Sequence, residues 1–358
     1  MRKKKILYIV TDIATAGGVM SIVSKKANFL AQNGYSVDIM SIRVAGKPFY
    51  PLEDTIQVLN FSKQGKRFLQ NVITSIQTIN GRKYDIVISA DSQYLTWVLP
   101  FFSNAKNVLE LHQSYDGIKE YLNRKFNSKI IVSFFSFLKK VAYPFYDIIV
   151  TLTEEDKKKW GYKKTIVIPN FHTLTVKKEN SESRHSIVCV GRFHHQKGYH
   201  LLVEAWKIVT SKYPDWTLDY YGEAVNTNTL NMLKELSAPT TFVLKGYERN
   251  PDVLYGGYYL NIVPSISESF SLSTIEAMCY GVPTISFDTT GPRSIITNGG
   301  NGILVKSYDT VGMANEIMAI IEDRCTRKKM SDSCLKTANN YKREMIMARW
   351  ERLFDKIL

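Results

Sequence analysis

Residues 6–40, ILYIVTDIATAGGVMSIVSKKANFLAQNGYSVDIM, contain the pattern that decides the fold. The apolar run at residues 6–10 predicts a buried strand, and apolar residues at helical spacing predict a helix over residues 20–33. The Gly17-Gly18 pair forms the turn between them, and residues 36–40 predict the next strand. A strand, a helix and a second strand in this order are typical of a parallel sheet.

The same alternation continues along the chain, with a break in the middle. Further short apolar runs predict strands at residues 86–89, 107–111, 148–151 and 166–170, and then at 186–190, 217–221, 241–244, 260–263 and 284–287. A polar stretch at residues 177–184 predicts a linker. We therefore expect an α/β fold of two Rossmann-like domains facing a central cleft, at residues 1–176 and 184–337, with a helix at 338–358 that packs back on the first domain.

Length and composition are those of a two-domain globular protein. The 358 residues are 44% hydrophobic and 22% charged, which excludes a disordered or fibrous chain. The four cysteines form no CxxC pair, so a reduced, cytoplasmic compartment is the simplest interpretation. The apolar stretch at residues 6–10 is too short for a signal peptide, and the run at 130–138 is about half the length that spans a bilayer.

The net charge of +14 is concentrated in the first half of the chain. Residues 1–180 contain 27 Lys and Arg against 14 Asp and Glu, whereas residues 181–358 contain 20 against 19. This asymmetry indicates an anionic surface as a partner of the first half, although drift in surface composition would also produce it.

The stretch with the most chemical information is PSISESFSLSTIEAM at residues 264–278, between a predicted strand and a helix. Ligands of parallel sheets bind beyond the carboxyl ends of the strands, and helix N-termini suit phosphate groups. Glu268 and Glu276 are eight positions apart, about two helical turns, so both can face one cleft. A simple helix-capping pattern with a surface glutamate is the alternative.

The stretch GRFHHQKG at residues 191–198 also lies between a strand and a helix. Arg192 and Lys197 can converge on a diphosphate there, because charge-assisted contacts to phosphate are strong. A solvated basic turn would have the same composition. The Gly17-Gly18 turn lacks the full G-x-G-x-x-G spacing of a dinucleotide site.

Taken together, these stretches resemble the retaining GT-B glycosyltransferases of glycosyltransferase family 4. The resemblance covers nearly the whole chain, and the motifs that carry it are Gly17-Gly18-Val19, Glu110-Leu111-His112, residues 147–153, residues 167–170, residues 190–193 with Lys197-Gly198, residues 221–223, Glu268 with Glu276, and residues 280–283. The run at residues 285–293 is similar to members that build bacterial surface polysaccharides and lipid-linked glycans.

The resemblance implies roles for individual residues. Glu268 corresponds to the glutamate near the donor sugar, and Glu276 to the one that holds the ribose hydroxyls. Arg192 and Lys197 correspond to the pair that neutralises the diphosphate. The remaining donor contacts implied by the resemblance are the amides around Phe270, Ser271 and Leu272, Gly17 and Gly18 in the first domain, and Tyr247 beside the base; His112 of the first domain would act on the sugar.

The implied activity is that of a hexosyltransferase-type enzyme of class EC 2.4. It would move a sugar from a nucleotide diphosphate donor, a UDP-sugar by preference, to a glycan or lipid-linked saccharide in bacterial polysaccharide biosynthesis. We expect no cofactor and no metal, because the chain has no Asp-x-Asp motif and the His194-His195 pair lacks a third ligand. The common Glu-Gly-Phe-Gly motif is Glu-Ser-Phe-Ser at residues 268–271, so the loop is bulkier beside the phosphates.

Other functions remain open at this point. A nucleotide-sugar epimerase would need no acceptor, and a phosphorylase-like GT-B enzyme would hold pyridoxal phosphate on a lysine. A non-catalytic scaffold that binds nucleotide sugar or membrane is the third alternative. No nucleic-acid partner is expected.

Two segments of the first domain predict attachment to an anionic membrane, and hence a peripheral location on the inner face of the plasma membrane. Residues 63–69 bring three basic side chains to the start of a helix, and residues 129–140 enclose an apolar run between lysines. A helix buried against the sheet with basic ends is the alternative for the second segment.

Overall fold

The chain forms two compact units. The computed structural model describes residues 3–43, 46–60, 68–90, 94–118, 129–177, 184–222 and 225–358, and their side chains except those of residues 68, 129–132 and 134–136. Unit 1 consists of residues 1–169 and 346–358, and unit 2 of residues 170–345.

The boundary between the units precedes the polar stretch where the sequence predicted a linker, and residues 338–345 lie in unit 2 rather than with the last helix. The reason is a set of backbone contacts made by His172. Its N–H donates to the carbonyl of Tyr341 at 3.0 Å, and its carbonyl accepts the N–H of Arg343 at 3.2 Å. These bonds hold residues 170–177 in unit 2, beside residues that are far away in sequence.

Within the described residues, unit 1 contains a sheet of seven strands in the order β3-β2-β1-β4-β5-β6-β7, and every neighbouring pair is parallel. The strands are β1 (Lys5–Val10), β2 (Ser36–Ser41), β3 (Gln57–Asn60), β4 (Ile86–Ser89), β5 (Lys106–Leu111), β6 (Ile148–Thr151) and β7 (Thr165–Val167). The helices are α1 (Gly18–Gln32), α2 (Phe68–Arg82), α3 (Tyr94–Phe102), α5 (Lys129–Ala142), α6 (Glu154–Trp160) and the 3-10 turn η1 (Tyr143–Phe145), and most of α14 (Arg343–Ile357) also belongs here.

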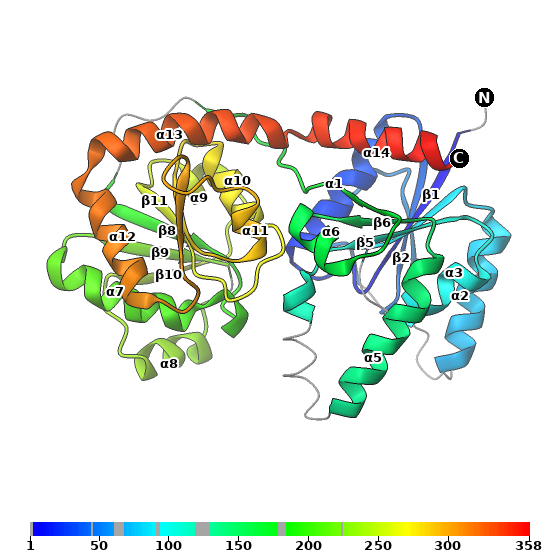
Figure 1. The fold of residues 1–358 in the computed structure, drawn as a ribbon, viewed down its shortest axis with the longest axis horizontal. Helices are drawn as coiled ribbons and strands as arrows, with labels where there is room; N and C mark the ends of the chain where they lie inside the picture. The colour runs from blue at the N-terminus through cyan, green and yellow to red at the C-terminus, as the bar shows by residue number, and fades with distance from the viewer. Residues whose placement is uncertain are drawn as a thin grey trace. The chain divides into compact units, whose positions relative to one another are not determined.

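Helices cover both faces of this sheet (Figure 1). Strand side chains alternate between faces, so Leu109 and Leu111 join one apolar cluster with α2, α3 and α5. Glu110 and His112 therefore point to the opposite face, which α1 and α14 cover. The fold thus brings a carboxylate and an imidazole under helices from the two ends of the chain.

Unit 2 repeats the architecture. Its described residues form a parallel sheet of six strands in the order β10-β9-β8-β11-β12-β13. The strands are β8 (Ser186–Val190), β9 (Thr217–Tyr221), β10 (Phe242–Gly246), β11 (Leu260–Val263), β12 (Thr284–Phe287) and β13 (Gly302–Val305). The helices are α7 (Tyr199–Lys212), α8 (Thr227–Glu235), α9 (Pro251–Tyr255), α10 (Leu272–Met278), α11 (Thr290–Arg293), α12 (Thr310–Glu322) and α13 (Arg324–Ala338), with 3-10 turns η2 (His195–Lys197) and η3 (Asn339–Tyr341).

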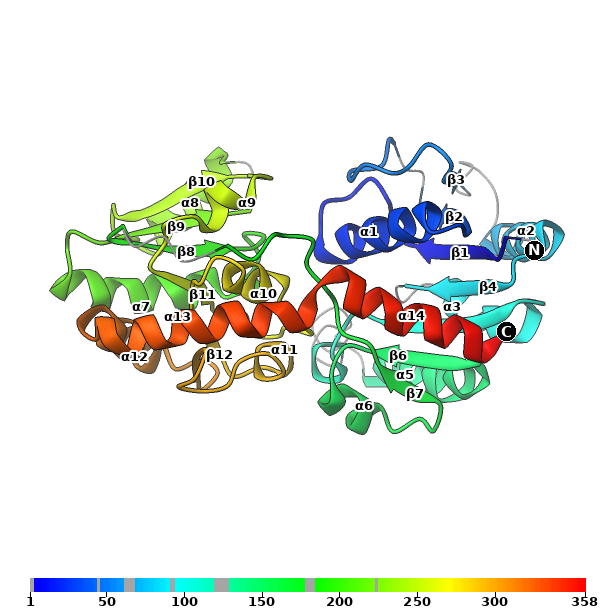
Figure 2. The same cartoon turned by 90° about the horizontal axis from the view of Figure 1, so that it is seen from above.

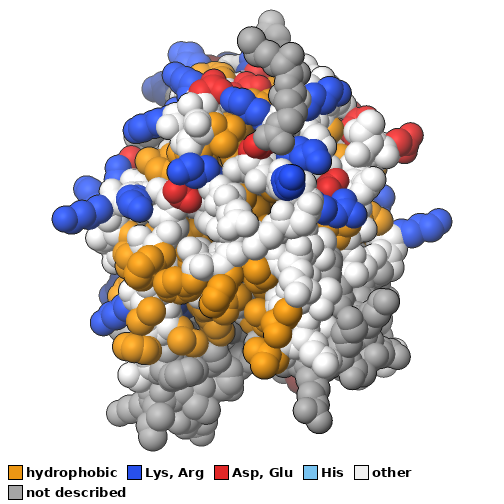
Figure 3. All heavy atoms as spheres, turned by 90° about the vertical axis from the view of Figure 1, so that its right-hand side faces the viewer, with side chains coloured by type: hydrophobic (Ala, Val, Ile, Leu, Met, Phe, Trp, Pro, Cys, Tyr) orange, Lys and Arg blue, Asp and Glu red, His pale blue; other side chains and the backbone are white. Residues whose placement is uncertain are grey.

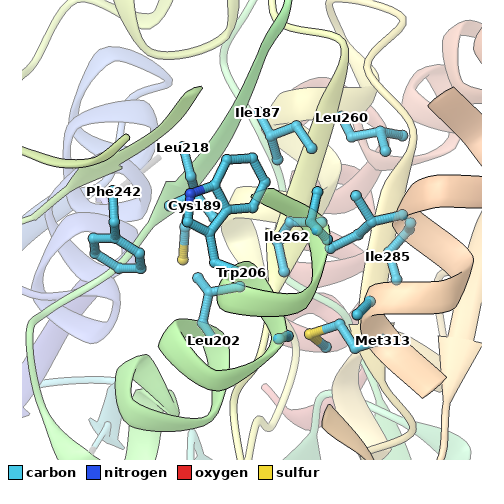
Figure 4. Packing of buried hydrophobic residues seen from close by; sticks show 14 of the residues in the cluster. Ile187, Cys189, Leu202, Trp206, Leu218, Phe242, Leu260, Ile262, Ile285 and Met313 are labelled. Carbon is cyan, nitrogen blue, oxygen red and sulfur yellow. The ribbon is translucent and has the colours of Figure 1, made fainter. Parts of the chain in front are cut away.

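The main core of unit 2 lies between this sheet and helices α7 and α12 (Figures 2 and 4). Trp206 of α7 is fully buried there, and its indole N–H donates to Thr241 Oγ1 at 3.0 Å. The other face packs on α9 and α10 through a smaller cluster that includes Val188, Tyr221 and Tyr255. The prediction of an α/β fold with two parallel-sheet domains is confirmed.

Candidate functional site

The strand order of unit 2 reverses between β8 and β11, and in open α/β sheets ligands bind at such a reversal beyond the carboxyl ends. The loops that leave these two strands contact each other. The N–H of Ile266 donates to the carbonyl of Gln196 at 2.9 Å, and the Gln196 amide donates to the carbonyl of Ser267 at 3.1 Å. The two segments chosen from the sequence, 191–198 and 264–278, therefore meet at one edge of the sheet.

Two glycines allow these loops to pack closely. Gly198 has φ +68°, and a Cβ atom on it would lie 1.9 Å from the carbonyl oxygen of Pro264. A Cβ on Gly291 would lie 2.4 Å from the backbone nitrogen of Phe270. No other residue fits at either position without displacing backbone, so both glycines fix the shape of the loop after β11.

Lys197 and Glu268 form an ion pair where the loops meet. Lys197 Nζ lies 2.5 Å from Glu268 Oε2, and the hydroxyl of Ser265 donates to the same oxygen at 3.2 Å. The side chains are 28% and 14% exposed, so each keeps one edge open to solvent. The resemblance assigned Lys197 to the diphosphate and Glu268 to the sugar of the donor, and in the fold the two side chains contact each other directly.

Helix α10 begins at the same edge. Its N-cap, Ser271, is left-handed with φ 69°, and its side chain accepts no hydrogen bond from a backbone N–H of the first turn. The Ser271 hydroxyl instead pairs with Thr274 Oγ1 at 2.7 Å. The Phe270 ring makes an edge contact with the Tyr341 ring, and the partly buried Leu272 starts the helix. Residues 270–272 thus form the start of α10, with the side chains of Phe270 and Ser271 buried.

Glu276 is held by a tyrosine that the sequence did not single out. The hydroxyl of Tyr255 on α9 donates to Glu276 Oε2 at 3.1 Å. Burial raises the pKa of Tyr255 well above its usual value, and the neighbouring Glu276 raises it further, so the phenol remains a donor. Nothing in the local pattern distinguishes Tyr255 from the nearby Tyr258 and Tyr259.

Arg192 and Tyr247 are the members of the predicted set whose side chains are exposed. The guanidinium of Arg192 makes no hydrogen bond or ion pair with any described side chain, while its carbonyl accepts the hydroxyl of Tyr220 at 3.1 Å. Tyr247 follows β10, is 44% exposed, and carries Arg249 against its ring at 5.7 Å. Both side chains are available to a ligand.

The remaining predicted residues lie in unit 1. Gly17 precedes α1, where its N–H donates to the Tyr50 hydroxyl at 3.3 Å, and Gly18 is the first residue of that helix. His112 follows β5 and is buried, with Nε2 at 3.3 Å from Glu110 Oε1.

Glu110 is itself buried and paired with the ammonium of Lys26. Burial acts to raise the pKa of Glu110, but Lys26 and His112 outweigh it and bring the pKa to about 2. The carboxylate beside His112 is therefore ionised at neutral pH.

Among the residues that the structure describes, no three His, Cys, Asp or Glu side chains gather as a metal-binding group. In the same part of the chain, no helix combines the length and the hydropathy needed to cross a bilayer.

Comparison with known proteins agrees with this architecture. Residues 171–337 match the family described as Glycosyl transferases group 1. An uncharacterized glycosyltransferase of Haemophilus influenzae is 26% identical over 97% of this chain and 99% of its own length.

Two solved structures share the fold over 99% of the chain. Sucrose-phosphate synthase of Thermosynechococcus elongatus superposes with a TM-score of 0.82 at 18% identity over 99% of its own chain. HepE of Anabaena, solved in complex with UDP and glucose, superposes with a TM-score of 0.78 at 17% identity over its full chain. The group 1 domain match and the two-domain fold together support a GT-B glycosyltransferase.

Proposed function

We propose that this protein is a retaining, metal-independent hexosyltransferase that moves a sugar from a UDP-sugar to a glycan or lipid-linked saccharide in bacterial polysaccharide biosynthesis. The observation that carries the proposal is the meeting of two loops at the carboxyl ends of β8 and β11. There the Lys197–Glu268 pair lies beside the start of α10, at the carboxyl edge of the sheet, where α/β proteins of this kind bind nucleotides. UDP is the proposed carrier because a structure of this fold holds UDP and glucose.

The chemistry proposed for this edge is electrostatic. Cleavage of the bond between sugar and phosphate develops negative charge on the departing diphosphate. Arg192, Lys197 and the backbone amides of residues 270–272 would stabilise that charge, since fixed donors need no reorganisation as it appears. Glu276 would bind the ribose hydroxyls and Glu268 the sugar, while Gly17, Gly18 and His112 would serve the donor from unit 1.

A donor screen followed by a transfer assay tests the proposal. A UDP-sugar at a hundredfold excess over its dissociation constant should stabilise the protein by about 2.7 kcal/mol in thermal unfolding, and GDP- and ADP-sugars by less. With a saccharide acceptor, UDP release should then accompany a product that retains the anomeric configuration of the donor, by NMR. Conversion of the donor without any acceptor would indicate an epimerase, and a lack of stabilisation by every nucleotide sugar would refute the proposal.

Tyr255→Phe tests the support of Glu276. Loss of one hydrogen bond of about 1 kcal/mol should weaken UDP binding roughly fivefold. It should leave kcat nearly unchanged, because ribose contacts are the same in the ground and transition states. The measurement is the dissociation constant of UDP by calorimetry, together with kcat and KM.

The matched control is Tyr258→Phe, which also removes the hydroxyl of a buried tyrosine. The Tyr258 hydroxyl donates to Asp219 Oδ2 at 2.7 Å rather than to Glu276. This variant should bind UDP as the native protein does. Equal weakening in the two variants would show that general loss of packing, not Glu276, is responsible.

We also propose that unit 1 attaches to an anionic membrane, which would bring the enzyme to a lipid-linked acceptor on the cytoplasmic face. The support is an apolar surface on neighbouring helices of unit 1 (Figure 3). Its exposed members are Leu69 and Ile73 of α2, Phe101 and Phe102 of α3, Phe137 and Val141 of α5, and Phe145 of η1. The rings of Phe101 and Phe145 are 4.8 Å apart, so α3 and η1 share one face.

The charge of this surface favours anionic lipid. Helices α2, α3, α5 and η1 contain no Asp or Glu, while the last turn of α5 contains the exposed Lys140 next to the buried Lys139. Leu69, Phe102 and Phe137 are each at least 60% exposed, more than a solvated helix face requires. Residues 63–67 of the predicted basic segment lie outside the described residues, as do the side chains of most of the first half of α5.

Co-sedimentation with liposomes measures this attachment. The protein should pellet with vesicles that contain anionic lipid and much less with neutral ones, and high salt should release it. Phe102→Ser combined with Phe137→Ser should reduce pelleting severalfold. Val311→Ser, which removes an exposed apolar side chain from α12 in unit 2, is the control and should pellet normally. Equal pelleting on both kinds of vesicle, or none on either, would favour a soluble acceptor.

A further inference from the structure

Unit 1 contains an ion pair that is sealed from water by the last helix of the chain. The Lys26 ammonium of α1 contacts Glu110 Oε1 of β5, and their side chains are 1% and 0% exposed. The indole of Trp350 on α14 covers the ammonium, with Lys26 Nζ 4.1 Å from the ring centroid. Trp350 is itself fully buried.

Stability does not account for this arrangement. Burying two charges costs more than their attraction returns in many proteins, and apolar residues of similar size often replace such pairs without loss. The cost is higher here because Glu110 Oε2 and the Tyr8 hydroxyl are buried without a hydrogen-bond partner in the described part of the chain.

The geometry instead connects the pair to His112. His112 directly follows β5 and lies two positions after Glu110, so the two side chains extend to the same side of the sheet. His112 Nε2 lies 3.3 Å from Glu110 Oε1, the same oxygen that Lys26 contacts. One carboxylate oxygen therefore lies within ion-pair distance of both the imidazole and the ammonium.

We propose that Lys26, Glu110 and Trp350 are positioning residues that orient the His112 ring for sugar transfer. The Glu110 carboxylate fixes the imidazole, the Lys26 ammonium fixes the carboxylate, and the Trp350 indole keeps water from both. This inference rests on the proposed function, in which His112 acts on the transferred sugar. According to this inference, turnover depends on α14 through the contact of Trp350 with Lys26, in addition to any contribution of α14 to folding.

The test separates positioning from stability with a charge-neutral double variant. Lys26→Met and Glu110→Gln each leave one buried charge without its partner, whereas the two together remove both charges. We expect the double variant to recover most of the thermal stability that either single variant loses. Its kcat should still be roughly 10- to 100-fold below the native value, because His112 has lost the group that orients it, with the donor KM little changed.

Two further comparisons connect the effect to His112 and to α14. In a His112→Ala background, the double substitution should cause no additional loss of kcat, because both changes act on the same group. Trp350→Leu should lower kcat more than Leu353→Ala, which truncates another buried residue of the same helix.

Four outcomes decide the matter. A stable double variant with native kcat would overturn the inference, and so would a full additional loss in the His112→Ala background. Equal kcat in Trp350→Leu and Leu353→Ala would overturn the part assigned to Trp350. Failure of the native protein to transfer sugar from any donor would refute the proposed function and this inference with it, whereas the other outcomes leave the proposed function intact.

Discussion

Replacing Arg192 by Ala should lower kcat about 10²- to 10³-fold, which corresponds to roughly 2.7–4 kcal/mol in the barrier, the range for loss of one preorganised donor. The guanidinium is exposed and forms no ion pair with a described residue, so its removal should leave unit 2 folded. The loss would then reflect uncompensated charge on the departing diphosphate. The measurement is steady-state kcat, with a thermal unfolding curve for the same sample.

Lys197→Ala should lower kcat by a similar factor, and it should also change the donor KM. Its removal also releases Glu268, which pairs with it at 2.5 Å, so the donor KM should change together with kcat. Lys207→Ala is the control, because this lysine of α7 pairs only with Glu204 on the same helix among described residues. It should keep native turnover. Near-native kcat in both Arg192→Ala and Lys197→Ala would refute the assignment of the diphosphate site.

Loss of one partner of the Lys26–Glu110 pair should destabilise unit 1 by about 3–5 kcal/mol, since the other charge stays buried and uncompensated. At about 2–4 °C per kcal/mol for a unit of this size, Lys26→Met or Glu110→Gln should unfold about 6–20 °C earlier. Combining the two substitutions should restore most of the difference. Additive losses in the combined variant would mean that the pair is not coupled.

The pH dependence of stability provides a second measure of this pair. Burial acts to raise the pKa of Glu110, but Lys26 and His112 lower it from 4.5 to about 2 in the folded state. A depressed pKa contributes stability above the unfolded value, and that contribution is lost as the pH falls from about 4.5 through 2. The native protein should therefore lose up to about 3 kcal/mol between pH 5 and pH 2 that the Lys26→Met/Glu110→Gln variant does not lose.

Most strands could be predicted from sequence because their signal is local. The strands at residues 86–89, 148–151, 186–190, 217–221, 260–263 and 284–287 have the predicted bounds. Strands β3 and β13 were missed, and both are four-residue strands at the edge of their sheet. The expected helix at 338–358 is interrupted at residues 339–342, where a bridge between His172 and Lys342 replaces helical bonds.

The predicted site residues differ in what the fold adds to them. Arg192, Lys197, Glu268 and Glu276 could be chosen because each follows a predicted strand at a loop with unusual composition. The contacts of Lys197 with Glu268 and of Tyr255 with Glu276 could not be predicted from sequence, since the partners are 71 and 21 positions apart. Such contacts follow from which strands are neighbours, and local periodicity does not determine strand order.

The sequence by itself determined the α/β class, the two parallel sheets and the glycine-rich and basic loops at the ends of their strands. These features depend on properties of short segments: the helical spacing of apolar residues, the alternation of apolar strands with amphipathic helices, and the conformational freedom of glycine. Only the tertiary structure decided that Lys26 lies against Glu110 and beneath Trp350. From the sequence alone, a lysine on a helix would be expected to face solvent. The contact of Lys26 with Glu110 and Trp350 joins residues up to 324 positions apart. It forms because strand pairing and helix packing bring distant parts of the chain together around the buried ion pair.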